Sequence, residues 1–404
     1  MPWRIVSFGL LLSFSSSFGQ THFISLFNES FRLQFGLSHG DIGFLYACGT
    51  LASAATLVWV GRWIDWMDLR RYTVLVMVGL IVACLSASVV TSAIGLGVVF
   101  YLLRLFGQGL SSHVAVTTVS RHTDAMRGRA LGITGMGHSL GEVVFPALIV
   151  TAIATVGWRA SWGLSATLQL GMLAVALVLV WPQRTRSAPA ARESDGETRA
   201  SWTLGQVLRD GRYACLLPMM MAQPSIVTAL FFHQQSLAAD QAVPFLFWAS
   251  GIAVYSLAVV LVALGAGVLV DRFSGAQLVR YGLLPLVLSP LVLVFGEVPG
   301  QHFLYFGLMG ACVGFMSPTL SALWVELYGV AHLGAVRSFN HAYMVFSSAL
   351  GPVVFGALLD AGLAWDTLLL ASTGFCVLAT GVPWWVRYGY TSPPASQSSV
   401  KRVS

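Results

Sequence analysis

The sequence predicts an all-α membrane protein with twelve transmembrane helices, arranged as two pseudo-symmetric halves of six helices each. Three observations support this fold class: the composition, the spacing of apolar stretches and an internal repeat. Of the 404 residues, 56% are hydrophobic and 9% are charged, whereas a soluble globular domain has about 25% charged residues. One buried core cannot enclose so much apolar surface, so we expect much of it to face lipid.

Apolar stretches long enough to cross a bilayer, which takes about 20 residues, occur twelve times in the chain. They are residues 5–27, 42–61, 72–93, 97–119, 130–153, 160–181, 213–235, 246–270, 280–297, 302–325, 338–360 and 366–387.

The longest polar stretch, residues 182–212, separates the first six spans (residues 1–181) from the last six (residues 213–387). Its Ala, Ser, Pro and charged residues are typical of a flexible linker. We expect this linker in the cytoplasm, together with a C-terminal tail at residues 388–404.

Basic residues test the orientation of the spans. If the N-terminus is cytoplasmic, 19 of the 22 Lys and Arg residues fall in cytoplasmic segments, Arg32 and Arg159 lie outside, and Arg104 lies within a span. This distribution follows the positive-inside rule, so the net charge of +6 reflects topology and not nucleic-acid binding. Short loops and a bias of 21 Arg to one Lys favour a bacterial cytoplasmic membrane, with both termini in the cytoplasm.

An internal repeat relates the two halves. LGEVVFPALI (residues 140–149) aligns with LGPVVFGALL (residues 350–359), with seven of ten residues identical. GRWID (residues 61–65) aligns with GVLVD (residues 267–271), and both place Gly and Asp four residues apart at the inner end of a span. A repeat of six spans is typical of transporters, and it predicts a binding site at the bilayer midplane between the halves.

Several motifs resemble those of the major facilitator superfamily. Gly61-x-x-x-Asp65 followed by Arg70-Arg71, and Gly267-x-x-x-Asp271-Arg272, are similar to its loop motif after spans 2 and 8. Arg104 followed by Gly107-Gln108-Gly109 is similar to its span-4 motif, and GWRASW (residues 157–162) to the usual start of span 6. The resemblance covers the whole chain and implies the major facilitator fold and transport by alternating access.

A narrower resemblance concerns the fifth span. RGRALGITGMGHSLG (residues 127–141) is similar to the start of that span in monocarboxylate and oxalate–formate type carriers. Two features depart from the family pattern. Trp66 and Asp68 stand where the loop motif usually has Arg and Gly, and span 8 lacks the intramembrane Asp-Arg pair of many monocarboxylate carriers.

Glu142 and Arg104 are the charged residues near the middle of the spans. A charge within the hydrocarbon costs at least a few kcal/mol unless it is paired or hydrated. Spans 4 and 5 are joined by a short loop, so we expect the two charges to meet or to face one cavity. A structural ion pair is the alternative to a substrate or proton site. The position at the repeat interface favours the functional interpretation. Pro352 occupies the equivalent position in the second half, so the fold itself does not require the acid.

His138 precedes Glu142 by four residues, so both share one helix face. Histidine titrates near neutral pH, and we expect Glu142, with or without His138, to carry a coupling proton. A neutral, hydrogen-bonded histidine inside the bundle is an equally good interpretation of His138.

Arg104 is also the candidate ligand of a small organic anion, because its guanidinium matches a carboxylate. Gln108 shares its helix face. Gln20 in span 1 and Gln223 in span 7 are further candidates for the same binding site.

The resemblance to the superfamily also implies a cytoplasmic gate in which Asp65 and Asp271 hold neighbouring helices together when the carrier faces outward. Their candidate partners are Arg70, Arg127, Arg272 and Arg337, and Glu326 is placed to pair with Arg337. Ordinary loop charges that obey the topology are the alternative.

The predicted function is proton-coupled transport of a small, monocarboxylate-like organic anion by a monomeric carrier. Proton-driven efflux of an amphipathic compound is the runner-up. A membrane sensor would need a larger soluble segment. An enzyme would need a nucleophile–base set or metal cluster, and neither is recognisable in the sequence; the five cysteines fall in different spans. We therefore expect neither enzymatic activity nor a cofactor or metal.

Overall fold

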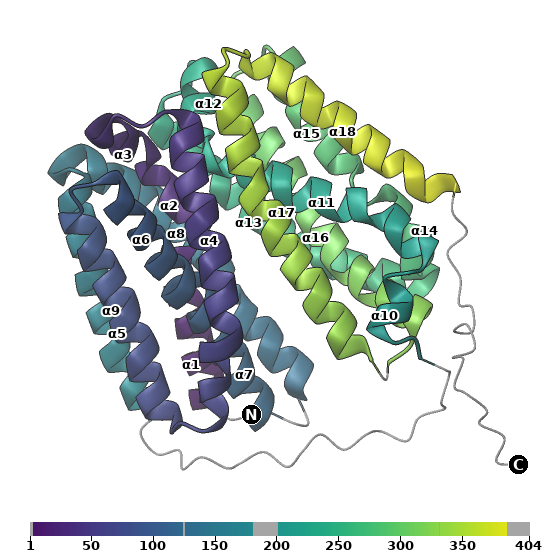
Figure 1. Cartoon of the computed structure of the whole chain (residues 1–404), viewed down its shortest axis with the longest axis horizontal. Coiled ribbons are helices and arrows are strands. Elements are labelled where there is room, and N and C mark those ends of the chain that lie inside the picture. Colours follow the sequence, from purple (N-terminus) through teal and green to yellow (C-terminus); the bar gives the residue numbers. More distant parts are fainter. Residues whose placement is uncertain (1–2, 124–125, 181–200, 331, 386–404) are drawn as a thin grey trace, which may run out of the picture.

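The computed structural model describes residues 3–123, 126–180, 201–330 and 332–385, and these residues form helices without any β-strand (Figure 1). Eleven segments within this part of the chain are long and apolar enough to cross a membrane. The predicted first span adds a twelfth segment, which is broken into short helices. The all-helical fold class is thus confirmed.

The first half begins with the broken segment and continues with five spans. Its elements are α1 (Trp3–Ser15), η1 (Ser16–Gly19), α2 (Thr21–Ile24), η2 (Ser25–Phe27), α3 (Asn28–Phe35), α4 (His39–Val60), η3 (Gly61–Asp65), α5 (Leu69–Val89), α6 (Ala93–Leu102), η4 (Leu103–Ser111), α7 (Ser112–His122), α8 (Arg127–Val156) and α9 (Trp158–Val180).

The second half carries six spans and four short elements. Its elements are α10 (Leu204–Val207), α11 (Gly211–Phe232), α12 (Gln234–Asp240), α13 (Phe245–Phe273), α14 (Gly275–Leu278), η6 (Val279–Tyr281), α15 (Leu284–Phe295), α16 (Gln301–Tyr328), α17 (Leu333–Asp360) and α18 (Trp365–Trp385).

A capping box stabilises the N-terminus of α4. The Ser38 hydroxyl accepts a hydrogen bond from the Asp41 backbone N–H (3.1 Å), and the Asp41 carboxylate accepts one from the Ser38 N–H (3.0 Å). Both donors would otherwise lack an intrahelical partner. Gly36, with φ of +63°, ends α3 just before it, in the left-handed region that glycine adopts without strain.

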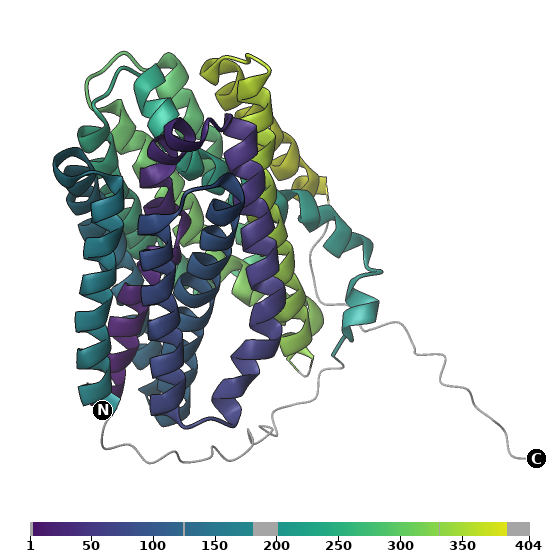
Figure 2. The same ribbon diagram turned by 60° about the vertical axis from the view of Figure 1, so that its left-hand side comes forward.

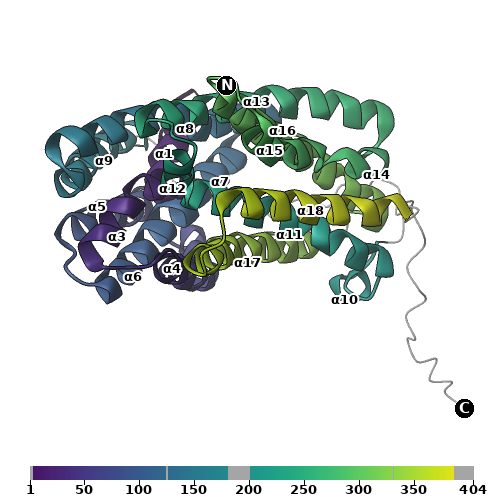
Figure 3. The same cartoon turned by 90° about the horizontal axis from the view of Figure 1, so that it is seen from above.

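Each half has its own apolar core, and the two halves lie side by side when seen from above (Figure 3). The outward faces of α9 and α13 expose large apolar side chains, such as Val178 (63% exposed) and Val268 (70%). Such surfaces suit a lipid environment and would be unusual on a soluble monomer.

The halves touch at one end of the bundle and diverge at the other (Figure 1). Figure 2, in which the first half lies in front, shows α4 beside α17 of the second half. We call the diverging end the basic end; it carries Arg62, Arg70, Arg71, Arg121, Arg272 and Arg337. We call the end at which the halves touch the opposite end; α4 begins there and α17 ends there. Among the described residues, hydrogen bonds between the halves lie at the opposite end or at mid-depth. The protein is therefore closed at the opposite end.

Three expected spans differ from the structure. The first, expected as one helix over 5–27, is interrupted at Gln20. The fourth, expected over 97–119, contains the π-helix η4. The ninth begins earlier, at Gly275, because α14 and η6 precede α15.

Most of the expected linker and all of the expected tail lie outside the described residues. The described end of the linker, residues 201–212, contains α10 and the first two residues of α11, and the Trp202 N–H donates to the Tyr328 carbonyl (3.0 Å). This part of the segment is therefore packed on the second half.

Candidate functional site

The site lies where the first span is broken. Gln20 adopts an extended conformation (φ −86°, ψ 155°) between η1 and α2, which interrupts the helical hydrogen bonding. The π-helix η4 of the fourth span packs against η1 at this break. Gly19 and Gly107 allow the contact, since a Cβ on Gly107 would lie 2.6 Å from the Gly19 Cα. π-helical segments of this kind often occur at functional sites.

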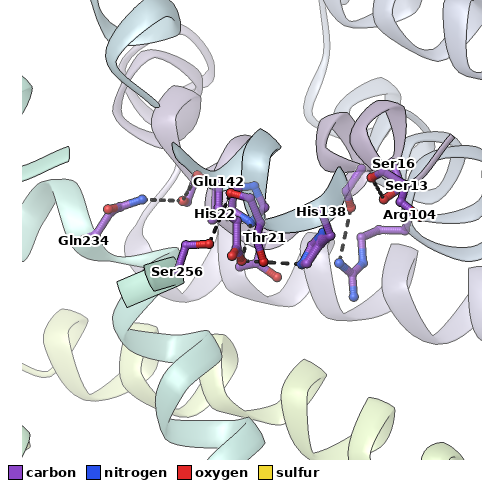
Figure 4. A network of polar contacts seen from close by, with 12 residues as sticks. Ser13, Ser16, Thr21, His22, Arg104, His138, Glu142, Gln234 and Ser256 are labelled. Carbon is purple, nitrogen blue, oxygen red and sulfur yellow. Dashed lines mark hydrogen bonds and ion pairs between the residues drawn. The ribbon is translucent and has the colours of Figure 1, made fainter. Parts of the chain in front are cut away.

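Glu142 of α8 lies beside this break, between two imidazole rings (Figure 4). Its Oε1 is 3.4 Å from His138 Nε2 and 3.6 Å from His22 Nδ1. Glu142 and His22 are buried, whereas the His138 side chain is 38% exposed. The rings of His22 and His138 are 5.7 Å apart. The carboxylate is thus enclosed by two imidazole rings, whose nitrogens can each donate or accept a hydrogen bond.

The second half also contributes to this site, through α13. The Ser256 hydroxyl donates to the Ser139 carbonyl on α8 (3.1 Å) and interacts with the Glu142 carboxylate. The neighbouring Tyr255 is buried and lies in the electrostatic range of Glu142. Because α8 and α13 belong to different halves, any movement between the halves changes the surroundings of Glu142.

Arg104 of η4 lies on the other side of the first span from Glu142. Its Nη1 donates to the Gly19 carbonyl (3.3 Å), and its guanidinium carbon lies 5.3 Å from the centroid of the Tyr46 ring. The residue is 3% exposed, and its Nε has no hydrogen-bond partner within the described protein. No carboxylate in the described ranges lies within 4.0 Å of this guanidinium.

The two mid-span charges, which the sequence suggested as neighbours, therefore do not form an ion pair in this conformation. His22 stands between them, within electrostatic range of Arg104 and in contact with Glu142. The expected link between spans 4 and 5 is thus indirect, because the broken first span inserts between them.

The expected polar ligands are half-buried. Gln20 lies at the break itself, Gln108 on η4 and Gln223 on α11. Their side-chain amides form no hydrogen bond with any residue that the structure describes.

Sequence reasoning missed His22, Tyr46 and Ser256. A signal for His22 was present, because SSSFGQTH (residues 15–22) is an unusually polar run within an apolar span. Tyr46 and Ser256 carry no comparable signal; they reach the site through the packing of α4 and α13.

The expected gate residues lie at the basic end, with different partners from those expected. Asp65 forms an ion pair with Arg121 of α7, which the sequence analysis did not select. The Glu326 carboxylate accepts hydrogen bonds from the N–H groups of Gly275 (2.7 Å) and Ala276 (2.9 Å), so it caps α14 where a pair with Arg337 was expected.

The remaining gate candidates are spread over the basic end. Asp271, Arg272 and Arg337 are exposed, and the Arg272 guanidinium lies over the Phe273 ring at 5.3 Å. Arg70 lies in the first turn of α5, where its N–H donates to the Asp68 carboxylate (3.0 Å). The side chain of Arg127 lies outside the described structure. Within the described ranges, no group of three or more His, Cys, Asp or Glu side chains is arranged to hold a metal ion.

Two six-helix halves, with a polar site between them and one end open, define a membrane carrier of the alternating-access class. The family model described as Major Facilitator Superfamily matches residues 9–254 and 248–403. The chain therefore belongs to this superfamily, whose members are carriers and not enzymes.

Solved structures of transporters share the fold. A mutant form of the nucleoside transporter NupG is similar with a TM-score of 0.74 and 13% identity, over 94% of this chain and 99% of that one. A bacterial homologue of the human lysosomal transporter Spinster, in an inward-facing and unoccupied conformation, has a TM-score of 0.74 and 15% identity, over 95% and 96%. At these identities the similarity shows the fold alone. No curated protein sequence matches the chain.

Proposed function

We propose that the chain is a proton-coupled transporter of small organic anions, in which Glu142 carries the proton and Arg104 balances the charge of the anion. The observation that carries this proposal is the enclosure of Glu142 by His22 and His138 beside the break in the first span. The monocarboxylate-like substrate class is part of the proposal.

The proton role follows from burial and access. A buried carboxylate is costly unless it is protonated or faces a cation. Glu142 contacts two imidazoles, so one proton shared among the three groups neutralises the carboxylate or supplies its counter-charge. An ionisable side chain exposed to lipid would be costly as well. We infer that the exposed part of His138 faces the space between the halves, where it offers the proton a path to the open basic end.

The anion role follows from the unmatched charge of Arg104. Arginine keeps its charge in proteins and offers five N–H donors. One donor is used on the Gly19 carbonyl, Nε is unpartnered, and a carboxylate partner is missing among the described residues. The amides of Gln20, Gln108 and Gln223 supply additional donors around it. Since Arg104 is buried, an anion reaches it after the first span moves at its break.

His22 couples the two roles. It touches Glu142 and lies within electrostatic range of Arg104. An anion that arrives at Arg104 favours a proton on His22 or Glu142, because opposite charges attract strongly where the dielectric constant is low. Proton and anion then cross the membrane together.

The orientation that the basic residues favour makes the basic end cytoplasmic, with both termini on that side of a bacterial cytoplasmic membrane. In this orientation the structure faces inward. Asp65 and Asp271 then close the basic end in the outward-facing state, with partners from among Arg70, Arg127, Arg272 and Arg337. The carrier works as a monomer.

Proteoliposomes that contain a pH-sensitive dye test the proposal. Small carboxylates, nucleosides and lipophilic cations are added separately to wild type, Glu142→Gln and, as a matched control, Glu297→Gln, which changes an exposed loop residue. We expect a carboxylate to drive proton movement in wild type and Glu297→Gln, and not in Glu142→Gln. Equal movement in all three proteins contradicts the role of Glu142. A response to nucleosides or cations alone contradicts the anion, and a response to cations favours drug-like efflux.

A further inference from the structure

The closed opposite end contains a contact that the transport site does not use. Asp360, the last residue of α17, points its carboxylate at the first residues of α4 in the other half. Its Oδ1 accepts a hydrogen bond from the His39 N–H (2.9 Å), and its Oδ2 accepts one from the Gly40 N–H (2.7 Å).

This contact is favourable for two physical reasons. The first N–H groups of a helix have no partner within the helix, and the N-terminus carries a partial positive charge that attracts an anion. Both carboxylate oxygens are used, and hydrogen bonds to an ionised acceptor are among the stronger ones.

The crossing of α4 and α17 is built for close approach. A Cβ on Gly43 would lie 2.6 Å from the Pro352 carbonyl oxygen, and one on Gly356 would lie 2.6 Å from the His39 carbonyl carbon. A Cβ on Gly40 would lie 2.8 Å from the Asp360 carboxylate itself. Glycine at these positions lets the two backbones meet, which brings Asp360 within reach of the α4 N-terminus.

Several polar side-chain atoms are buried at this closed end without a hydrogen-bond partner to replace the water they lose. The atoms without a hydrogen-bond partner in the described protein are Asn28 Oδ1, Arg32 Nε, His39 Nδ1, Gln234 Oε1 and Gln235 Oε1. Two further hydrogen bonds join the halves here, from Asn28 Nδ2 to the Phe232 carbonyl (2.6 Å) and from Gln234 Nε2 to Ser25 Oγ (2.8 Å). Polar atoms that lose water on burial disfavour the closed state, so the closed state depends on the contacts that offset this cost.

We propose that Asp360 is a latch that holds the opposite end closed by capping α4 across the two halves, and that it thereby sets the balance between the two states of alternating access. It is a positioning residue, since it lies far from Glu142 and Arg104. The latch forms in the state seen here and opens when the opposite end opens.

Spin labels on Leu33→Cys of the first half and Val298→Cys of the second half, both exposed at the opposite end, measure this balance by double electron–electron resonance. The accessible cysteines Cys48 and Cys215 are replaced by Ala; the other three are buried, and buried thiols react poorly. Asp360→Ala, Asp360→Asn and Asp360→Glu are compared with Asp366→Asn, an exposed acid at the start of α18.

We expect Asp360→Ala to raise the ratio of long to short label distances by roughly twofold to fivefold, the effect of losing a favourable charge at an exposed helix N-terminus. Asp360→Asn raises it less, because its amide oxygen still accepts one bond. Asp360→Glu retains the wild-type distribution in large part, and Asp366→Asn retains it fully.

An unchanged distribution in Asp360→Ala overturns the latch, and so does an equal change in Asp366→Asn. Thermal unfolding of each variant shows whether a changed distance distribution comes from a shift between two folded states or from general loss of structure. Asp360→Glu is a second control, because it changes the side chain but keeps the charge. The measurement requires neither substrate nor proton gradient. The result for Asp360 can therefore be interpreted even if Arg104 binds no anion or Glu142 carries no proton.

Discussion

Gly137 on α8 gives a sharp test of how the first span is held next to Glu142. A Cβ at this position would lie 3.0 Å from the Leu10 carbonyl carbon and the Phe14 nitrogen, and closer still to the Leu10 carbonyl oxygen. These are backbone atoms of α1, so they cannot rotate away as a side chain can. Gly135, two residues earlier on the same helix, has nothing within 4 Å of a built Cβ.

Gly137→Ala therefore separates α8 from α1 by about 1 Å, the distance needed to restore a normal nonbonded separation. Overpacking of this kind costs about 1–3 kcal/mol, against a gain of roughly 0.5–1 kcal/mol from replacing Gly by Ala in a helix. Gly135→Ala receives the gain alone. We expect the two variants to differ by about 2 kcal/mol in the free energy of unfolding.

The displacement of α8 from α1 in Gly137→Ala breaks one of the two contacts of Glu142 and leaves the other. The contact between His22 and Glu142 (3.6 Å) joins two helices and is lost when α8 moves, whereas the contact between His138 and Glu142 (3.4 Å) lies within α8 and persists. Denaturant titration in detergent measures the stability, and proton flux in proteoliposomes measures the coupling. Equal stability of Gly137→Ala and Gly135→Ala would refute the packing argument.

Three further predictions concern single contacts. His22→Gln leaves the contact between His138 and Glu142 in place but removes the link toward Arg104, so we expect fewer protons taken up per anion bound, measured with a pH dye in weakly buffered detergent solution. Asp65→Asn removes an exposed ion pair with Arg121 that contributes about 0–1 kcal/mol, so the unfolding temperature should change little. Because Asp65 is proposed to close the basic end in the outward-facing state, its loss disfavours that state, and the labels at the opposite end should report a more closed state. Burial raises the pKa of Asp210, but hydrogen bonds from Arg212 and Tyr328 outweigh it and hold that pKa below its ordinary value of 3.8. Its stabilising effect is therefore present above the ordinary pKa and fades as the pH falls through the lowered one, so Asp210→Asn should lower the unfolding temperature at neutral pH and converge with wild type in strong acid.

Composition and hydropathy were sufficient to predict the spans and the two halves, because lipid demands long apolar helices with internal hydrogen bonding. The facing pair His138 and Glu142 was also predictable, since a separation of four residues places them on one helix face. These features depend on local sequence alone.

Other features depend on contacts between distant segments, which no local pattern encodes. The break at Gln20 has no proline to mark it; it is stabilised by η4, more than 80 residues along the chain, through Arg104 and the Gly19 carbonyl. The inserted first span is the reason that Glu142 faces His22 and not Arg104. Asp360 reaches α4 across 321 residues, and its role depends on how the halves meet.

The central claim is that Glu142 binds a proton together with the anion. Calorimetric titration with the transported carboxylate, in buffers of different ionisation enthalpy, counts the protons taken up on binding. We predict that wild type takes up protons when it binds the anion, at most about one proton per anion, and that Glu142→Gln takes up almost none. The same uptake in both proteins would contradict the claim.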